Sequence, residues 1–356
     1  MAKKAPALVP LDLGPAQAGG LIAALVLGVL VGLVALMALP VDRYYQWQQV
    51  DGTILFRARW IYERIHFDPT PIDAAVIGSS RMEASVRTPE LSRMLSQRLG
   101  RPIHVVNFAL PQEGRDLHWA VADELLANRP ELRLLLLSAS PEAVLSHPGF
   151  RFLGDDRSVA GSPALYNPSY VDNLLTLPYR HLSYFVQGLW PRAFQLSPRF
   201  DPAIYRARGF DPTDSFVSAT GNFVDRNRQL DPATVDAQRA ARAAEMRVDP
   251  KLRFLPLDRR YAVERHFDRK IARAARDRGV MLGFLRVPVF DAEEHFADPA
   301  FYRAIGPVWE ASLLGSDPAD YMDMAHLNRH GTARLLPWLA DRLAPLLAAP
   351  EKPHVR

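Results

Sequence analysis

Two short motifs hold polar side chains that together could carry out nucleophilic chemistry. Ser79 and Ser80 stand in "IGSSRM", and Asp323 and His326 stand in "DMAH" near the C-terminus. A serine hydroxyl becomes a good nucleophile when a histidine takes its proton, and a carboxylate usually orients that histidine. Because Asp323 and His326 are three residues apart on one expected loop, the carboxylate can reach one imidazole nitrogen while the other faces the serine. We therefore predict a triad of His326, Asp323 and one of the two serines.

A metal site is the competing interpretation of the second motif. His326 and His330 are four residues apart and could share one face of a helix. The zinc-protease pattern, however, requires a glutamate directly after the first histidine, where this chain has Leu327. The chain also has no cysteine, which excludes disulfides, thiol catalysis and thiolate ligands. We expect neither a metal nor a cofactor.

The elements that must position the triad alternate between buried strands and helices. Apolar runs at residues 74–77, 102–110, 132–140 and 280–290 predict strands, and helices are expected at 88–99, 114–130, 256–279 and 332–349. This alternation predicts an α/β fold with a parallel sheet and helices on both faces, a three-layer α/β/α arrangement. Ligands of such sheets bind beyond the carboxyl ends of the strands, where "GSS" and "SAS" stand.

An apolar segment precedes this domain. Residues 20–39, "GLIAALVLGVLVGLVALMAL", contain no charged side chain and as a helix would be about 30 Å long, enough to cross a bilayer core. The run is longer than that of a cleaved signal peptide, so we predict an uncleaved transmembrane anchor. Basic residues on both sides of the run leave its orientation open.

These features divide the chain into five parts. We expect an N-terminal tail (1–19), an anchor (20–40), a juxtamembrane segment (41–70), the α/β domain (71–346) and a C-terminal tail (347–356). The strand and helix alternation stops within an insertion at about 141–255, which is rich in proline, glycine, arginine and aromatic residues. Large apolar residues at 173–194 suit an interface with a membrane or a partner, or a helical cap that folds back onto the domain itself.

The two motifs resemble those of the SGNH hydrolase superfamily (GDSL-like), and in particular its membrane-anchored members. In that family a glycine-x-serine turn after the first strand supplies the nucleophile, and a C-terminal Asp-x-x-His supplies the base and its carboxylate. The resemblance covers residues 71–140 and 256–346 and implies an SGNH, flavodoxin-like fold with Ser80 as nucleophile. Where the family holds the oxyanion with a glycine amide and an asparagine, this chain has Ala109 and Ser140. The resemblance implies that these residues and the Ser80 amide bind the oxyanion.

The membrane-anchored relatives that the chain resembles are of the DltD and AlgJ/AlgX type, which work beside a membrane-bound O-acyltransferase (MBOAT). This implies a single-pass protein of the cytoplasmic (inner) membrane with a periplasmic catalytic domain. Its expected reaction is transfer of an acetyl or similar acyl group, through an acyl-serine, to a cell-surface polysaccharide or teichoic-type polymer. A non-catalytic scaffold or polymer-binding subunit, and a simple carbohydrate esterase, are the alternatives. The 43 basic and 39 acidic residues are too evenly balanced to indicate nucleic-acid binding.

Overall fold

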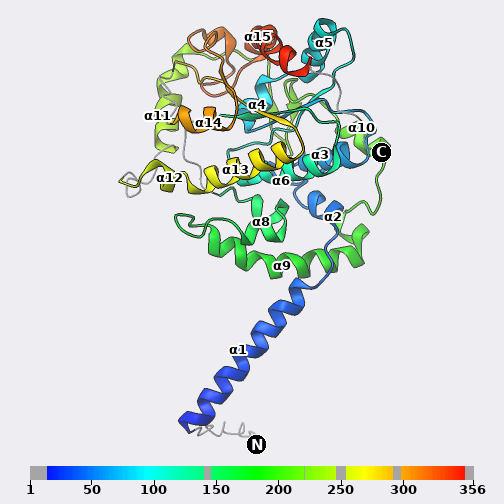
Figure 1. The fold of residues 1–356 in the computed structure, drawn as a ribbon, viewed down its shortest axis with the longest axis vertical. Coiled ribbons are helices and arrows are strands. Elements are labelled where there is room, and N and C mark those ends of the chain that lie inside the picture. Colours follow the sequence, from blue (N-terminus) through cyan, green and yellow to red (C-terminus); the bar gives the residue numbers. More distant parts are fainter. Residues whose placement is uncertain (1–13, 140–145, 220, 246–253, 292–297, 349–356) are drawn as a thin grey trace, which may run out of the picture.

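A long apolar helix projects from a mixed α/β domain (Figure 1). The computed structural model describes residues 14–139, 146–219, 221–245, 254–291 and 298–348. An 18-residue window of helix α1 (Pro15–Met37) has a mean hydropathy of 2.8, and none of the residues of the helix is buried. The helix begins at Pro15. Proline suits this position because the first backbone N–H groups of a helix have no partner within it, so the missing N–H costs no hydrogen bond. The expectation of one N-terminal helix long and apolar enough to span a membrane is confirmed.

The domain is built on a five-stranded parallel sheet with the strand order β2-β1-β3-β6-β7. These strands are β1 (Ala74–Ile77), β2 (Val105–Asn107), β3 (Leu134–Ser138), β6 (Met281–Arg286) and β7 (Val308–Glu310). The four strands expected from the sequence are present, and the parallel sheet is confirmed. The edge strand β7 was not predicted, since its three residues are too few to show a hydrophobic period.

Alternate side chains of the central strands enter two separate hydrophobic clusters. Ile77 and Leu137 belong to a cluster with α6 (Arg115–Asn128) and α13 (Ala262–Asp277). Val76 and Leu136 belong to a second cluster with α5 (Thr88–Leu99) and α15 (Arg329–Leu347). Successive residues of a strand point to opposite sides of a sheet, so both faces of these strands are buried.

The segment between α1 and the sheet is part of the folded domain. It forms α2 (Arg43–Gln48) and α3 (Ala58–His66), and Trp47 and Ile61 are fully buried in the first cluster. The small elements outside the insertion are α4 (Ser80–Ser85), α12 (Leu257–Arg260), α14 (Pro299–Ile305) and η4 (Pro318–Asp320).

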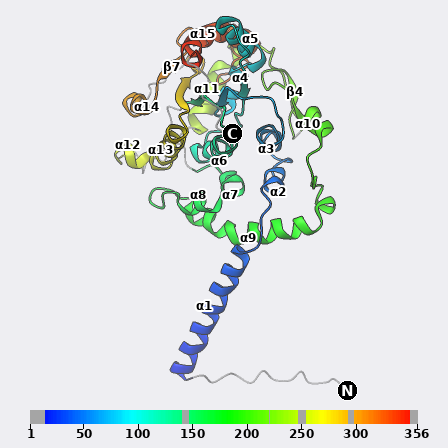
Figure 2. The ribbon, with the colours of Figure 1, turned by 45° about the vertical axis from the view of Figure 1, so that its right-hand side comes forward.

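The insertion has two parts with different positions in the molecule. Its first part forms α7 (Phe150–Leu153), α8 (Asp156–Ala160), α9 (Tyr170–Leu189), η1 (Pro191–Phe194) and α10 (Pro202–Arg208). Helix α9 crosses the end of the domain from which α1 leaves (Figures 1 and 2). The second part forms a hairpin of β4 (Phe216–Val217) and β5 (Phe223–Val224), then η2 (Pro232–Thr234) and α11 (Val235–Glu245).

Candidate functional site

The turn after β1 delivers Ser80 to the first position of α4. Gly78 makes this turn possible, because β1 passes close to α4 and to the end of β3. A Cβ atom at Gly78 would lie 2.5 Å from Met82 Cγ and 2.8 Å from Ser138 Cβ, closer than real contacts allow. The glycine of the "GSS" motif is therefore required by space. Ser79 is 2% exposed and occupies the N-cap position of α4 without a capping hydrogen bond from its side chain, whereas Ser80 is only half-buried.

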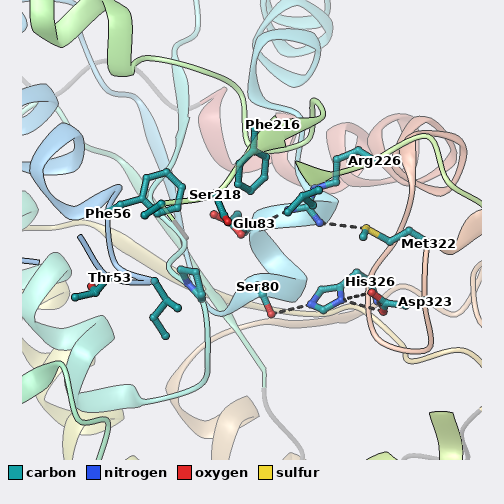
Figure 3. A pocket seen from close by; sticks show the side chains of 14 residues that line it. Thr53, Phe56, Ser80, Glu83, Phe216, Ser218, Arg226, Met322, Asp323 and His326 are labelled. Carbon is teal, nitrogen blue, oxygen red and sulfur yellow. Dashed lines mark hydrogen bonds and ion pairs between the residues drawn. The ribbon is translucent and has the colours of Figure 1, made fainter. Parts of the chain in front are cut away.

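Ser80, His326 and Asp323 form a continuous chain of contacts (Figure 3). The Oγ atom of Ser80 lies 2.8 Å from Nε2 of His326. On the other side of the ring, Nδ1 lies 2.9 Å from both carboxylate oxygens of Asp323. The structure thus brings together the three side chains predicted from the two motifs, in the order that a nucleophile, a base and an orienting carboxylate require.

The carboxylate of Asp323 is held in place by the loop that carries it. Its Oδ1 atom accepts hydrogen bonds from the amides of Ala325, at 2.8 Å, and His326, at 2.9 Å. Burial on its own raises the pKa of Asp323, but the interactions with the His326 ring and these amides outweigh it and lower the pKa. The carboxylate is therefore ionised at neutral pH, the state that can stabilise an imidazolium.

Asn328 anchors the same loop at the start of α15. Its side-chain oxygen accepts from the amides of His330 and Gly331, and its Nδ2 group donates to the carbonyl of Tyr321 at 3.1 Å. The loop also closes on itself, since the Met322 amide donates to the His326 carbonyl at 3.0 Å. These bonds fix the backbone on both sides of Asp323 and His326.

The triad opens into a mostly apolar pocket of about 290 Å³. Its walls come from the segment before α3, from α4, from the β4–β5 hairpin and from the Asp323 loop (Figure 3). The lining residues are Thr53, Ile54, Phe56, Ser80, Glu83, Pro111, Phe216, Ser218, Ala219, Val224, Arg226, Met322, Asp323 and His326. A pocket of this kind favours a short apolar group next to Ser80.

Arg226 of the insertion contacts both α4, which carries Ser80, and the loop that carries Asp323 and His326. Its Nη2 atom lies 3.5 Å from Oε2 of Glu83, one helical turn after Ser80, and its Nη1 atom donates to Met322 Sδ at 3.4 Å, next to Asp323. Its Nε atom donates to the Pro212 carbonyl at 3.0 Å. Burial lowers the pKa of this guanidinium below its usual value, although the nearby Glu83 carboxylate partly opposes the shift. Sequence reasoning missed Arg226, because an isolated arginine in an aperiodic segment gives no local signal.

The same part of the insertion also contacts the Asp323 loop through backbone groups and one side chain. The Leu230 amide donates to the Tyr321 carbonyl at 2.7 Å, and the Arg329 amide donates to the Arg226 carbonyl at 2.8 Å. The Met324 amide donates to Gln238 Oε1 at 3.2 Å. Removing these partners would leave the Asp323 loop without several of its hydrogen bonds, so the insertion is part of the site.

The expected oxyanion donors differ in their placement. Ser80 begins α4, where backbone amides have no partner within the helix. The Ala109 amide instead donates to Asn107 Oδ1 at 3.0 Å, and its side chain is fully buried away from the pocket. It would have to leave Asn107 to reach an oxyanion. Ser140 lies outside the described residues.

The histidines of the alternative metal interpretation have separate partners. His330 Nδ1 lies 2.9 Å from Asp320 Oδ1, whereas the His326 ring lies between Ser80 and Asp323. Across the described ranges, no group of three or more histidine, cysteine, aspartate or glutamate side chains is arranged to hold a metal ion.

Comparison with known proteins finds no matching family model and no matching curated protein. The resemblance to SGNH hydrolases therefore rests on the two motifs and stays a prediction.

Proposed function

We propose that this protein is a membrane-anchored serine acyltransferase of the SGNH type. The observation that carries the proposal is the Ser80, His326 and Asp323 chain, with contacts of 2.8 and 2.9 Å, at the wall of an apolar pocket. A half-exposed serine hydroxyl that contacts a carboxylate-oriented imidazole is the arrangement that nucleophilic catalysis requires.

In the proposed first half-reaction, Ser80 Oγ attacks the carbonyl carbon of an acyl ester and passes its proton to His326 Nε2. The Asp323 carboxylate stabilises the imidazolium through Nδ1. Collapse of the tetrahedral intermediate breaks the bond to the leaving oxygen, which takes the proton from Nε2. The acyl group is then an ester on Ser80.

In the second half-reaction, the acceptor hydroxyl gives its proton to His326 Nε2 as its oxygen attacks the acyl-serine. The bond to Ser80 Oγ breaks, Oγ recovers the proton, and the acyl group leaves on the acceptor. Water in place of the hydroxyl gives free acid. The same residues thus support transfer and hydrolysis, and the acceptor decides between them.

Two structural features support the wider proposal. Helices α6 and α13 pack on one side of the central strands, and α5 and α15 on the other, as a three-layer SGNH fold requires. Helix α1 is suited to hold this domain at a membrane. We propose an extracytoplasmic (periplasmic) domain beside the cytoplasmic membrane, an MBOAT acyltransferase as the partner that supplies the acyl group, and a polysaccharide or teichoic-type acceptor.

The pocket indicates the size of the transferred group. Its volume is about 290 Å³, and its apolar side chains, such as Ile54, Phe56 and Val224, leave few polar partners for a sugar. An acetyl or other short acyl group suits this lining, because apolar contact and exclusion of water favour it there. The polymer acceptor would approach from the open mouth.

The proposal is tested with full-length protein in detergent, p-nitrophenyl acetate as donor and a soluble oligosaccharide as acceptor. Release of nitrophenol and a mass increase of one acetyl group on the oligosaccharide are expected. Both signals should fall to the background level in Ser80→Ala, while the matched Ser79→Ala variant retains acetyl transfer. Equal rates for wild type and Ser80→Ala would overturn the proposal, and free acetate without the sugar ester would favour an esterase.

A non-catalytic scaffold is the second candidate, and one observation favours it. The Ala109 amide is already bonded to Asn107, so the Ser80 amide is the only expected oxyanion donor that the described residues place at the site. Removal of one good oxyanion donor typically slows catalysis by about 100- to 1000-fold. A scaffold would retain polymer or partner binding in Ser80→Ala and show no acyl-serine.

A further inference from the structure

Helix α9 presents a row of large apolar side chains to solvent. Val171, Leu175, Tyr179, Leu182 and Leu189 follow one another at steps of three, four or seven residues, which places them on one face. Leu175 is 71% exposed, and Tyr179 is 66% exposed. A contiguous apolar face of this kind on a folded domain marks an interaction surface.

The opposite face of α9 is fixed to the domain by polar contacts. Arg180 donates to the carbonyls of Arg151 and Gly154 at 2.7 and 2.8 Å, and His181 Nε2 lies 2.8 Å from Asp156 Oδ2. Each of these contacts would be lost if the helix rotated to bury its apolar row. The apolar face is therefore held outward by the fold.

This face lies where α1 meets the domain. Figures 1 and 2 both show α9 lying across the end of α1, between α1 and the rest of the domain. The ring of His181 reaches the chain just after α1, with Nδ1 3.0 Å from the Leu39 carbonyl. Helix α1 ends at Met37, and its 23 residues span about 34 Å at 1.5 Å per residue. A bilayer core is about 30 Å thick, so a bilayer that contains α1 reaches the level of α9.

The residues that follow α9 have the composition of a membrane interface. Trp190 is 60% exposed and Phe194 is 47% exposed, and Arg192 between them is also exposed. Tryptophan, tyrosine and arginine are enriched at the level of lipid headgroups, where an apolar body and a polar or charged end both find partners.

We propose that α9 and η1 lie in the headgroup region of the bilayer, with the row from Val171 to Leu189 facing the acyl chains. The helix would then act as a second membrane contact that fixes the tilt and height of the domain. Helix α4, which carries Ser80, lies in the part of the domain away from α9 (Figures 1 and 2). The proposal rests on the proposed anchoring by α1 but not on the acyl-transfer chemistry.

The absence of cysteine from the chain allows a direct test on the full-length protein. Four variants would each carry one cysteine, at the position of Leu175, Leu182, Val29 or Gln97. Each variant would be nitroxide-labelled and reconstituted in nanodiscs of phosphatidylethanolamine and phosphatidylglycerol. Electron paramagnetic resonance then compares collisions of each label with oxygen, which enters lipid, and with a water-soluble nickel chelate. Val29 reports on α1, and Gln97 is an exposed control on α5.

We expect an oxygen-to-nickel ratio at Leu175 and Leu182 several times that at Gln97, with the highest ratio at Val29. Replacing both Val171 and Tyr179 with glutamate should raise nickel access at Leu182 without changing the Gln97 label. A lipid-like Val29 with a water-like Leu175 would overturn the proposal and leave the α9 face to a protein partner. A water-like Val29 would contradict the anchoring itself, and neither result depends on activity.

Discussion

The substitution Arg226→Met tests whether the insertion holds the triad together. It removes a guanidinium that contacts Glu83, Met322 and the Pro212 carbonyl, while the methionine keeps much of the apolar volume. Because Glu83 lies on the helix of Ser80 and Met322 adjoins Asp323, loss of Arg226 should loosen one half of the triad relative to the other.

The expected size of the effect follows from these contacts. A hydrogen bond from a charged donor, such as that from Arg226 to Pro212, contributes about 1.5–3 kcal/mol. Breaking a buried ion pair typically costs about 3–5 kcal/mol, but Glu83 would retain Arg57 at 3.3 Å, so the full cost does not arise. We expect the free energy of unfolding to fall by about 2–4 kcal/mol. Since a misplacement of about 1 Å can cost about 100-fold in rate, kcat should fall by about 10- to 100-fold.

The assay measures kcat and KM for a neutral acetyl ester, together with thermal unfolding. Arg228→Met is the matched control, because Arg228 is an exposed side chain two residues away and the change in charge is the same. Arg226→Lys should recover part of kcat, since an ammonium can still face Glu83. If Arg226→Met destabilises the protein but kcat at a temperature where it is fully folded equals that of Arg228→Met, the positioning role is refuted.

Three further predictions concern the turn, the carboxylate and a buried histidine. Gly78→Ala should lower the free energy of unfolding by about 1–3 kcal/mol and reduce ester hydrolysis, because the new Cβ atom has no space. In the control Gly52→Ala, the new Cβ atom meets nothing within 4 Å, so unfolding and ester hydrolysis should both stay unchanged. Asp323→Asn keeps an acceptor for the loop amides but favours the wrong imidazole tautomer, so kcat should fall by roughly 10⁴-fold while thermal unfolding stays near wild type. Burial lowers the pKa of His147 to about 4 from 6.5, so the unfolded chain binds a proton that the fold does not, and stability should fall by about 3 kcal/mol as the pH drops from 6.5 to 4. His147→Asn should remove that part of the slope in unfolding curves measured across this range, and an unchanged slope would contradict it.

The sequence indicated the triad and most of the sheet because their signals are local. A buried strand followed by a glycine and serines, and an Asp-x-x-His before a helix, can each be recognised within a dozen residues. The role of Arg226 depends on contacts with residues some 100 to 140 positions away in the chain, which no local pattern encodes.

Helix α9 was expected only as one alternative, a helical cap at residues 173–194, for a different reason. Its apolar residues interrupt polar ones, and Pro178 lies inside it, which normally argues against a helix interior. Its exposed face is rich in large apolar side chains and its buried face includes Asn173, Arg180 and His181, so its pattern departs from that expected for a helix packed on a soluble domain. The Ala109 amide could not be placed from sequence either, since its bond to Asn107 depends on the turn after β2.

Labelling of the nucleophile tests the central claim most directly. Full-length protein would be treated with a fluorophosphonate, which reacts with activated serine hydroxyls, and digested for mass spectrometry. We predict a single modified site at Ser80, lost in His326→Gln and absent from Ser80→Ala. Labelling of Ser79 instead, or an unmodified Ser80 in folded protein at neutral pH, would contradict the account.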